Sequence, residues 1–145
     1  MAVVSPIDRA ADAGPAVRLY DALARGDVTE TLASLHPEFR GYVSAGMPLG
    51  VGGSHDGPER MLLDCWAVVF ATYDIAPAPD EILVLPEGRL VAVGEYRGTE
   101  RATAREVRAA FAHILRVRDG LVSELRQITD TAAWTHDVGA PDGTA

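Results

Sequence analysis

Residues 106–131 form the stretch of sequence that most limits what this chain can fold into. Two runs rich in apolar residues flank Arg118-Asp119-Gly120, and Asp-Gly between such runs is a strong signal for a β-hairpin. Because side chains alternate along a strand, the first arm has two faces, and both are apolar. We therefore expect one face to line a core and the other to meet another layer or a second subunit. The first face carries Val107, Ala109, Phe111, His113 and Leu115, and the second carries Ala110, Ala112 and Ile114.

The rest of the chain contains helical and strand-like patterns. Helices are expected at residues 15–25, 28–35 and 58–73, and further strands at residues 39–43, 75–85 and 89–97. Pro77 and Pro79 indicate an edge strand or an irregular one. The glycine-rich residues 44–57 are expected to be irregular and are a candidate lid over a pocket. This order predicts an α+β fold in which a strongly curved, mostly antiparallel sheet holds three helices in its concave face.

Two of the expected helices have a definite apolar stripe. The stripe of the first consists of Val17, Tyr20, Leu23 and Ala24. The stripe of the third consists of Leu62, Leu63, Trp66, Val69 and Phe70. We expect both stripes to face the core, because a surface helix buries its apolar side.

Composition limits the class of protein. The 145 residues, 48% of them hydrophobic, fit one globular domain, which we place at residues 15–138 between disordered tails at 1–14 and 139–145. The formal net charge of -8 argues against nucleic acid or an anionic membrane as a partner, since both favour basic proteins. No run approaches the roughly 20 apolar residues of a membrane span. The single cysteine, Cys65, makes an intrachain disulfide impossible, and a cytoplasmic location is the simplest interpretation.

Four motifs, in this order and spacing, resemble a known superfamily. They are LYDALARGD (residues 19–27), LHPEFR (35–40), HDGPE (55–59) and RVRDGLVSELRQITDTAAW (116–134). The chain is similar to the nuclear transport factor 2-like superfamily, in particular to its SnoaL-like and ketosteroid-isomerase-like branch. The resemblance implies a cone-shaped barrel with a deep apolar pocket and a homodimer formed through the outer face of the sheet.

The resemblance also assigns roles to particular positions. His113 lies where ketosteroid isomerases place a pocket acid that hydrogen-bonds the substrate oxyanion. Gln127 lies where SnoaL-like cyclases usually place an aspartate that acts as acid and base, and glutamine cannot take a proton. The general base of the isomerases aligns near Val43, which is not a base either. The chain therefore departs from the standard chemistry of both branches.

His113 is the leading catalytic candidate from the residues themselves. An imidazole titrates near neutrality and can transfer a proton or bind an oxyanion. A polar group among apolar neighbours requires a reason, although a core histidine bonded to a neighbour is the alternative. Gln127, on one strand face with Leu125 and Thr129, is expected to orient a carbonyl, a water or His113.

Tyr42 and Glu95 complete the catalytic candidates. The neighbours of Tyr42 leave its direction open, and on the later strand either Glu95 or Tyr96 points inward. An inward Glu95 would supply a base, whereas Tyr42 or Tyr96 would help Gln127 to hold a substrate oxygen. The expected substrate-binding residues are Trp66, Phe70, Phe111, Tyr96, Leu115 and Thr129.

These features favour a cofactor-independent enzyme that acts on an apolar, oxygen-bearing small molecule. The resemblance favours a SnoaL-like cyclase or isomerase of polyketide-type secondary metabolism, such as antibiotic biosynthesis. A limonene-type epoxide hydrolase is one alternative, and it would need an Asp-Arg-Asp arrangement. A non-catalytic binding protein is the other, favoured if the pocket holds only apolar groups and amides. The spacing of His36, His55 and His136 supports no metal site, and no dinucleotide or phosphate motif is present.

Overall fold

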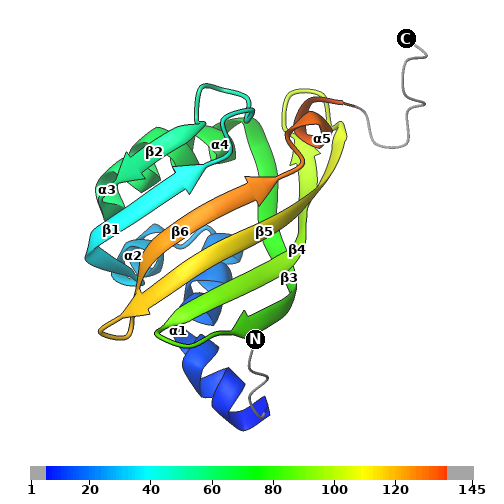
Figure 1. Ribbon diagram of the computed structural model, residues 1–145. Helices are drawn as coiled ribbons and strands as arrows, with labels where there is room; N and C mark the ends of the chain where they lie inside the picture. Colours follow the sequence, from blue (N-terminus) through cyan, green and yellow to red (C-terminus); the bar gives the residue numbers. More distant parts are fainter. Residues whose placement is uncertain (1–5, 137–145) are drawn as a thin grey trace.

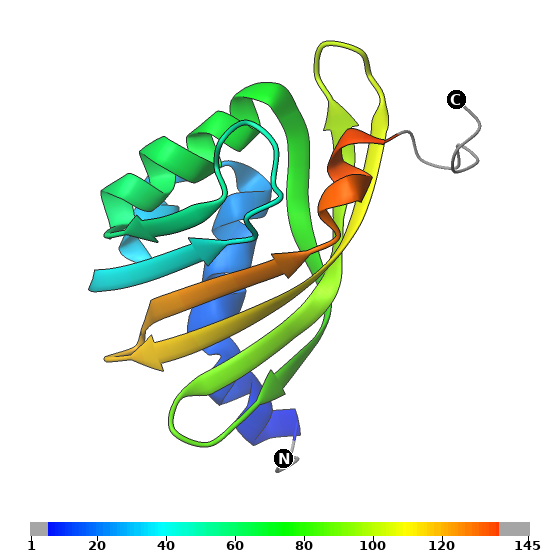
Figure 2. The ribbon, with the colours of Figure 1, turned by 45° about the horizontal axis from the view of Figure 1, so that its top comes forward.

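A single curved sheet forms the frame of the protein. The computed structural model describes residues 6–136, with side chains from Ala13 onward. The six strands lie in the order β2-β1-β6-β5-β4-β3, and neighbours are antiparallel except for the parallel pair β1 and β6. The expected α+β fold is confirmed, with the helices on the concave side of an unclosed sheet (Figures 1 and 2). The elements are α1 (Pro6–Arg25), α2 (Val28–Ala33), β1 (Leu35–Val43), β2 (Gly53–Asp56), α3 (Pro58–Met61), η1 (Leu62–Trp66), α4 (Ala67–Thr72), β3 (Tyr73–Val84), β4 (Arg89–Glu100), β5 (Glu106–Arg118), β6 (Leu121–Thr129) and α5 (Thr131–Thr135).

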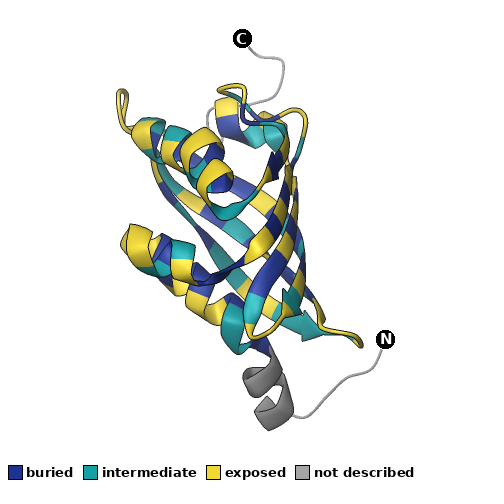
Figure 3. Ribbon diagram, turned by 90° about the vertical axis from the view of Figure 1, so that its left-hand side faces the viewer, coloured by how far each residue is buried: buried dark blue, intermediate teal, exposed yellow. Residues whose placement is uncertain are grey.

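The hairpin of β5 and β6 has the geometry that its sequence predicts. Asp119 and Gly120 have φ values of 56° and 75°, and positive φ at both central residues is characteristic of a type I′ turn. Val107, Ala109, Phe111, His113 and Leu115 are all buried on the concave face. The alternation of buried and exposed residues along the strands is visible in Figure 3.

Helix α1 packs against the sheet through a face that differs slightly from the expected one. Ala16, Leu19, Tyr20 and Leu23 are buried, whereas Val17 is 52% exposed. The predicted stripe was wrong at Val17 and at Ala24, which is also exposed. The helix is rotated toward Ala16 and Leu19, whose spacing with Leu23 is equally helical. The helix also includes residues 6–14, which we assigned to a tail, while residues 1–5 and 137–145 lie outside the described part of the chain.

The helix expected at residues 58–73 contains a π-helical segment. The α-helical turns α3 and α4 flank η1, and Met61, Cys65 and Val69 form the buried face. The prediction that Leu63 faces inward is wrong, since Leu63 is 61% exposed. A π-turn holds one residue more than an α-turn, so it rotates the residues before it relative to those after it.

Two further features of the sheet can be compared with the predictions from the sequence. β3 is an edge strand, as Pro77 and Pro79 predict, and its pairing with β4 shifts between Pro79 and Glu81. The glycine-rich stretch is not wholly irregular, because β2 lies within it and pairs with β1. That expectation failed because backbone pairing with an available edge can outweigh the low strand propensity of glycine.

Candidate active site

His113 lies at the centre of a buried chain of hydrogen bonds. It is 2% exposed, and β5 places it on the concave face toward helix α1. Its Nδ1 lies 2.8 Å from the hydroxyl of Tyr20 on α1, and its Nε2 lies 2.7 Å from the hydroxyl of Tyr96 on β4. The ring of Phe111 stacks against the imidazole at a centroid distance of 4.1 Å. The imidazole is therefore held on both nitrogens and on one face.

Gln127 continues this chain toward the start of the glycine-rich stretch. Its register partner across β5 and β6 is His113, so both side chains project from the same face of the sheet. The Gln127 amide nitrogen donates to Tyr96 Oη at 2.9 Å, and its Oε1 accepts from the backbone N–H of Ser44 at 3.2 Å. The result is one connected polar path, Tyr20–His113–Tyr96–Gln127–Ser44, which we call the polar relay.

Burial keeps the ionisable members of this relay uncharged. Burial lowers the pKa of His113 to about 3, so the imidazole is neutral near pH 7. Burial raises the pKa of both Tyr20 and Tyr96, so both phenols keep their protons. Burial also raises the pKa of the nearby Cys65 thiol to about 12, which disfavours a nucleophilic thiolate.

The relay borders a narrow apolar cavity. Tyr96, His113 and Gln127 form its polar end, and most of the remaining wall is apolar. The centre of a water molecule can occupy about 30 Å³ of the cavity. One water needs roughly 10–15 Å³ of volume measured in this way. A ligand larger than a few waters therefore requires the walls to move. The apolar wall includes Val43, Met47, Met61, Cys65, Trp66, Val69, Phe70, Ile75, Pro77 and Trp134.

Three side chains separate this cavity from a groove on the surface. Leu23, Phe70 and Ile75 line both the cavity and the groove, which runs between α1, α4 and β3. Phe70 is only partly buried and lies in α4, which directly follows the segment η1 that carries Cys65. These three residues are therefore a candidate entrance between the groove and the cavity.

Several residues expected from the sequence meet in this cavity. Trp66, Phe70 and Tyr96 line it together with His113 and Gln127. Phe111 lies behind the imidazole. Leu115 is packed in the core, and Thr129 bonds the Ala110 carbonyl and the Trp134 indole, so neither lines the cavity.

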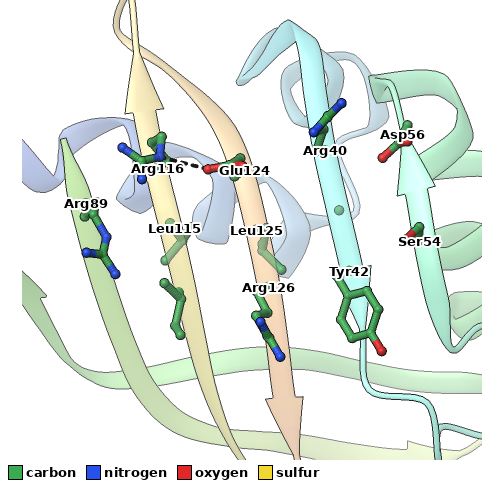
Figure 4. A pocket seen from close by; sticks show the side chains of 12 residues that line it. Arg40, Tyr42, Ser54, Asp56, Arg89, Leu115, Arg116, Glu124, Leu125 and Arg126 are labelled. Carbon is green, nitrogen blue, oxygen red and sulfur yellow. Dashed lines mark hydrogen bonds and ion pairs between the residues drawn. The ribbon is translucent and has the colours of Figure 1, made fainter. Parts of the chain in front are cut away.

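The expectation that Tyr42 and Glu95 contribute to the pocket is corrected by their position. Tyr42 is 41% exposed on the outer face of β1, with the Arg126 guanidinium over its ring at 5.5 Å (Figure 4). Glu95 forms ion pairs with Arg97 and Arg108, and these two arginines lower its pKa. Tyr96 is the residue that points inward, because strand alternation sends adjacent residues to opposite faces.

Two members of the relay were missed by sequence reasoning. Tyr20 was placed on the inner stripe of α1, but nothing in that pattern indicated which strand residue it would meet. Ser44 acts through its backbone N–H, which carries no sequence signal.

Within residues 6–136, no group of three His, Cys, Asp or Glu residues is placed to hold a metal ion. No helix among those residues is long and apolar enough to cross a membrane.

Comparison with known proteins identifies the fold family. A model of the SnoaL-like domain matches residues 16–125. The chain belongs to the SnoaL-like family. This family has the NTF2-like fold, in agreement with the curved sheet and its helices. No curated protein is similar enough in sequence to be matched to the chain.

Solved structures of SnoaL-like proteins superpose over most of the chain. An NTF2-like protein of unknown function from Burkholderia pseudomallei is 27% identical, with a TM-score of 0.77 over 89% of this chain and 98% of that one. A candidate SnoaL-like polyketide cyclase from Jannaschia is 20% identical, with a TM-score of 0.76 over 97% of this chain and 99% of that one. TerC, co-crystallised with polyporic acid, is 23% identical, with a TM-score of 0.75 over 85% of this chain and 94% of that one.

Proposed function

We propose that this SnoaL-like protein is a cofactor-independent enzyme that cyclises or isomerises an apolar, oxygen-bearing small molecule of the polyketide type. The polar relay at the end of an apolar cavity is the observation that carries the proposal. A purely structural core has no need of five linked polar groups, because apolar side chains of similar volume fill such a space without desolvation costs.

The cavity suits reactions in which negative charge develops on a substrate oxygen. Its apolar wall binds a carbon skeleton and excludes water, which strengthens each remaining polar contact. Hydrogen-bond donors that are already oriented stabilise such charge, and one of them can contribute about 3 kcal/mol. Tyr96, His113 and Gln127 are already fixed by one another.

An aldol cyclisation is a reaction of this type. The enol carbon of the substrate attacks a carbonyl carbon of the same molecule and forms a carbon–carbon bond. This bond closes the ring. As it forms, the enol O–H releases its proton and becomes a carbonyl group, while the π electrons of the attacked carbonyl move to its oxygen, which takes up a proton. Loss of water then leaves a carbon–carbon double bond in the ring. The reaction consumes no oxidant or reductant. The similarity to a candidate polyketide cyclase and to a protein that binds polyporic acid supports this class of substrate.

Incubation with an aryl 1,3,5-triketone tests the proposal. The substrate is a 1-arylhexane-1,3,5-trione, whose terminal methyl carbon can attack the carbonyl next to the aryl ring. Loss of water then gives a 5-arylresorcinol, which is separated by chromatography from the pyrone of equal mass that oxygen attack forms, and each is identified against a standard. We expect wild-type protein to accelerate ring formation and His113→Asn or Gln127→Leu to slow it by about a hundredfold. Tyr42→Phe, on the outer face, is the matched control and should keep the wild-type rate. An unchanged rate with wild-type protein would contradict the proposal.

A non-catalytic binding protein is the second candidate. No carboxylate lines the cavity, among the residues that the structure describes, so no strong base faces a ligand there. In that case the triketone or its cyclic product would bind without any change in rate. No aspartate or arginine lines the cavity either, so the Asp-Arg-Asp arrangement of an epoxide hydrolase has no support within residues 6–136.

We also propose that the protein is a homodimer through the outer face of its sheet. The centre of that face is apolar, with Val93 39% exposed and Ile128 50% exposed beside Ala112 and Ile114. Along one margin runs a row of charges of both signs, with Arg116 paired to Glu124 at 2.8 Å (Figure 4). A face that carries apolar area and both signs of charge can be complementary to a second copy of itself. In register order the row is Asp56, Arg40, Glu124, Arg116 and Arg89.

Light scattering after size exclusion tests the dimer. We expect wild-type protein to have twice the 15.4 kDa mass of one chain and Ile128→Glu to have the mass of one chain. Leu63→Glu, an equally exposed apolar position on the helical side, should remain dimeric. A monomeric wild-type protein would show that the outer face is not the interface.

A further inference from the structure

The hydrogen-bond directions within the relay identify the group that meets the substrate. We infer that the Tyr96 hydroxyl donates its proton to a carbonyl oxygen of the ligand, and that His113, as its Nε2–H tautomer, and Gln127 aim it into the cavity. The inference rests on the proposed function, because it assumes that a carbonyl compound occupies the cavity. Tyr96 is then the catalytic residue, and His113 and Gln127 are positioning residues.

The backbone N–H of Ser44 fixes the donor and acceptor directions of the hydrogen bonds in the relay. A backbone N–H can only donate, so the group that faces it at 3.2 Å must be the carbonyl oxygen of the Gln127 amide. The amide NH₂ is consequently directed at Tyr96 Oη, 2.9 Å away. Ser44 is itself held to β6, since its hydroxyl donates to the Gln127 carbonyl at 3.0 Å and accepts from the Thr129 N–H. The Tyr96 oxygen is therefore an acceptor in its bond with Gln127.

Two arrangements of protons are compatible with this constraint. A neutral imidazole has one donor nitrogen and one acceptor nitrogen. In the first arrangement Tyr96 donates to Nε2, and Nδ1–H donates to the Tyr20 oxygen. In the second arrangement Tyr20 donates to Nδ1, and Nε2–H donates to the Tyr96 oxygen. The two arrangements differ in which tyrosine hydroxyl retains an unused proton.

The surroundings of the two tyrosines favour the second arrangement. In the first, the unused proton belongs to Tyr20, which is 5% exposed and whose hydroxyl bonds only His113 among the described residues. A buried donor without an acceptor is costly. In the second, the unused proton belongs to Tyr96, which lines the cavity, whereas Tyr20 does not. A ligand carbonyl in the cavity then supplies the missing acceptor.

The second arrangement also makes Tyr96 suited to catalysis. Its oxygen accepts from both His113 Nε2–H and the Gln127 amide while its proton points at the ligand. Two donors on the phenolic oxygen stabilise the electron density that grows there as the proton moves toward a developing enolate. Polarisation along connected hydrogen bonds acts in the same direction. No charged group of the protein is needed for this step.

The tautomer of His113 tests the inference without any substrate. Nitrogen-15 NMR of the imidazole distinguishes a protonated ring nitrogen from an unprotonated one. For wild-type protein at pH 7 we expect His113 to be neutral, with the proton on Nε2 and none on Nδ1. Observation of the Nδ1–H tautomer would overturn the inference, even if the protein proves to be a cyclase.

A ketone probe tests the contact itself. We would record the infrared carbonyl band of acetophenone, labelled with carbon-13 at the carbonyl, bound to wild-type protein and to Tyr96→Phe. We expect the band at lower frequency in the wild type and the affinity about two- to tenfold weaker in Tyr96→Phe, the loss typical of one such hydrogen bond. Tyr73→Phe is the matched control, since it removes another buried hydroxyl, one that bonds the Trp134 carbonyl.

The outcomes separate this inference from the proposed function. A band shift that Tyr96→Phe abolishes, without triketone cyclisation, would support the Tyr96 contact and reject the cyclase. Cyclisation at the wild-type rate in Tyr96→Phe would support the cyclase and reject the role of Tyr96. Equal band positions in wild type and Tyr96→Phe would also overturn the inference. So would the absence of acetophenone binding up to the solubility limit of the ketone.

Discussion

At the residue scale, His113 illustrates how an environment changes what a side chain can do. In water an imidazole exchanges protons near pH 6.5, but here it is enclosed by Phe111, Tyr20 and Tyr96. The cost of burying a charge keeps it neutral, so it connects two hydroxyl groups and is a poor proton carrier at pH 7. His113 lies on the apolar inner face where it was expected, but both of its nitrogens bond protein groups, so we propose that it orients Tyr96 and does not transfer a proton itself.

This burial predicts a stability that depends on acidity. Between pH 6.5 and about 3 the unfolded chain binds a proton at His113 that the folded protein does not bind. The contribution of neutral His113 is therefore fully present above pH 6.5 and is lost as pH falls, by about 1.4 kcal/mol per pH unit. Urea unfolding of wild type and His113→Gln at pH 7, 6 and 5 measures it. The stability difference between the two proteins should shrink by about half that amount from pH 7 to pH 6 and by nearly the full amount from pH 6 to pH 5. Parallel curves would contradict the prediction.

At the element scale, strands β3 and β4 come so close together at Gly94 that a side chain does not fit. Gly94 faces the concave side of β4 opposite Pro79, next to the shift in the pairing of β3. A Cβ atom at Gly94 would lie 2.7 Å from the Cα of Pro79 and would overlap the Ala78 carbonyl oxygen. Backbone atoms cannot move aside as a flexible side chain can. Glycine at this position therefore permits the close approach of the two strands.

Gly94→Ala is expected to destabilise the protein by about 2 kcal/mol or more, because overpacking a rigid contact typically costs 1–3 kcal/mol. The free energy of unfolding from denaturant titration checks this value. A loss below about 0.5 kcal/mol would show that β3 can shift away without strain.

Gly14 offers the opposite case within helix α1. A Cβ atom built on it meets nothing within 4 Å. The next residue in the helix is Pro15, however, and the ring of a proline meets the Cβ of a helical residue that precedes it. This contact opposes the backbone entropy that alanine saves in a helix, so Gly14→Ala should change stability by less than about 0.5 kcal/mol. Denaturant unfolding of the two glycine variants side by side should show a large loss for Gly94→Ala only.

At the scale of the whole molecule, the relay and the surface groove lie on two sides of one thin wall. The cone formed by the sheet and helices keeps the cavity nearly closed, and Leu23, Phe70 and Ile75 separate it from the groove. A substrate that reaches Tyr96 by this route must displace Phe70. The π-helical segment before α4 is a place where the helix departs from regular geometry, and such segments are frequent at functional sites.

Shortening the Phe70 side chain is expected to change the rate at which a ligand enters the cavity. Phe70→Ala should raise the association rate constant of acetophenone at least about tenfold, because a closed protein binds only in its open fraction. Stopped-flow fluorescence of Trp66 and Trp134, which line the cavity, measures the rate. Leu63→Ala, an exposed change in the preceding segment, should leave it unchanged. An unchanged rate in Phe70→Ala would place the entrance elsewhere.

Several elements and faces could be predicted from local patterns in the sequence. The Asp119-Gly120 turn, the alternation through Phe111 and His113 and the edge position of Pro77 all follow from local rules of backbone and side-chain geometry. Family resemblance added the cone-shaped arrangement, and the structure agrees with it.

Which polar groups meet depends on how elements that are distant in the sequence pack together. Tyr20 and His113 are 93 residues apart, and the Ser44 N–H that orients Gln127 is 83 residues from it. Periodicity tells which face of its own element a residue occupies, but not the element opposite or the rotation at which that element packs. For the same reason Tyr42 and Glu95 were expected in the pocket and lie outside it, while a tyrosine from α1 completes the relay.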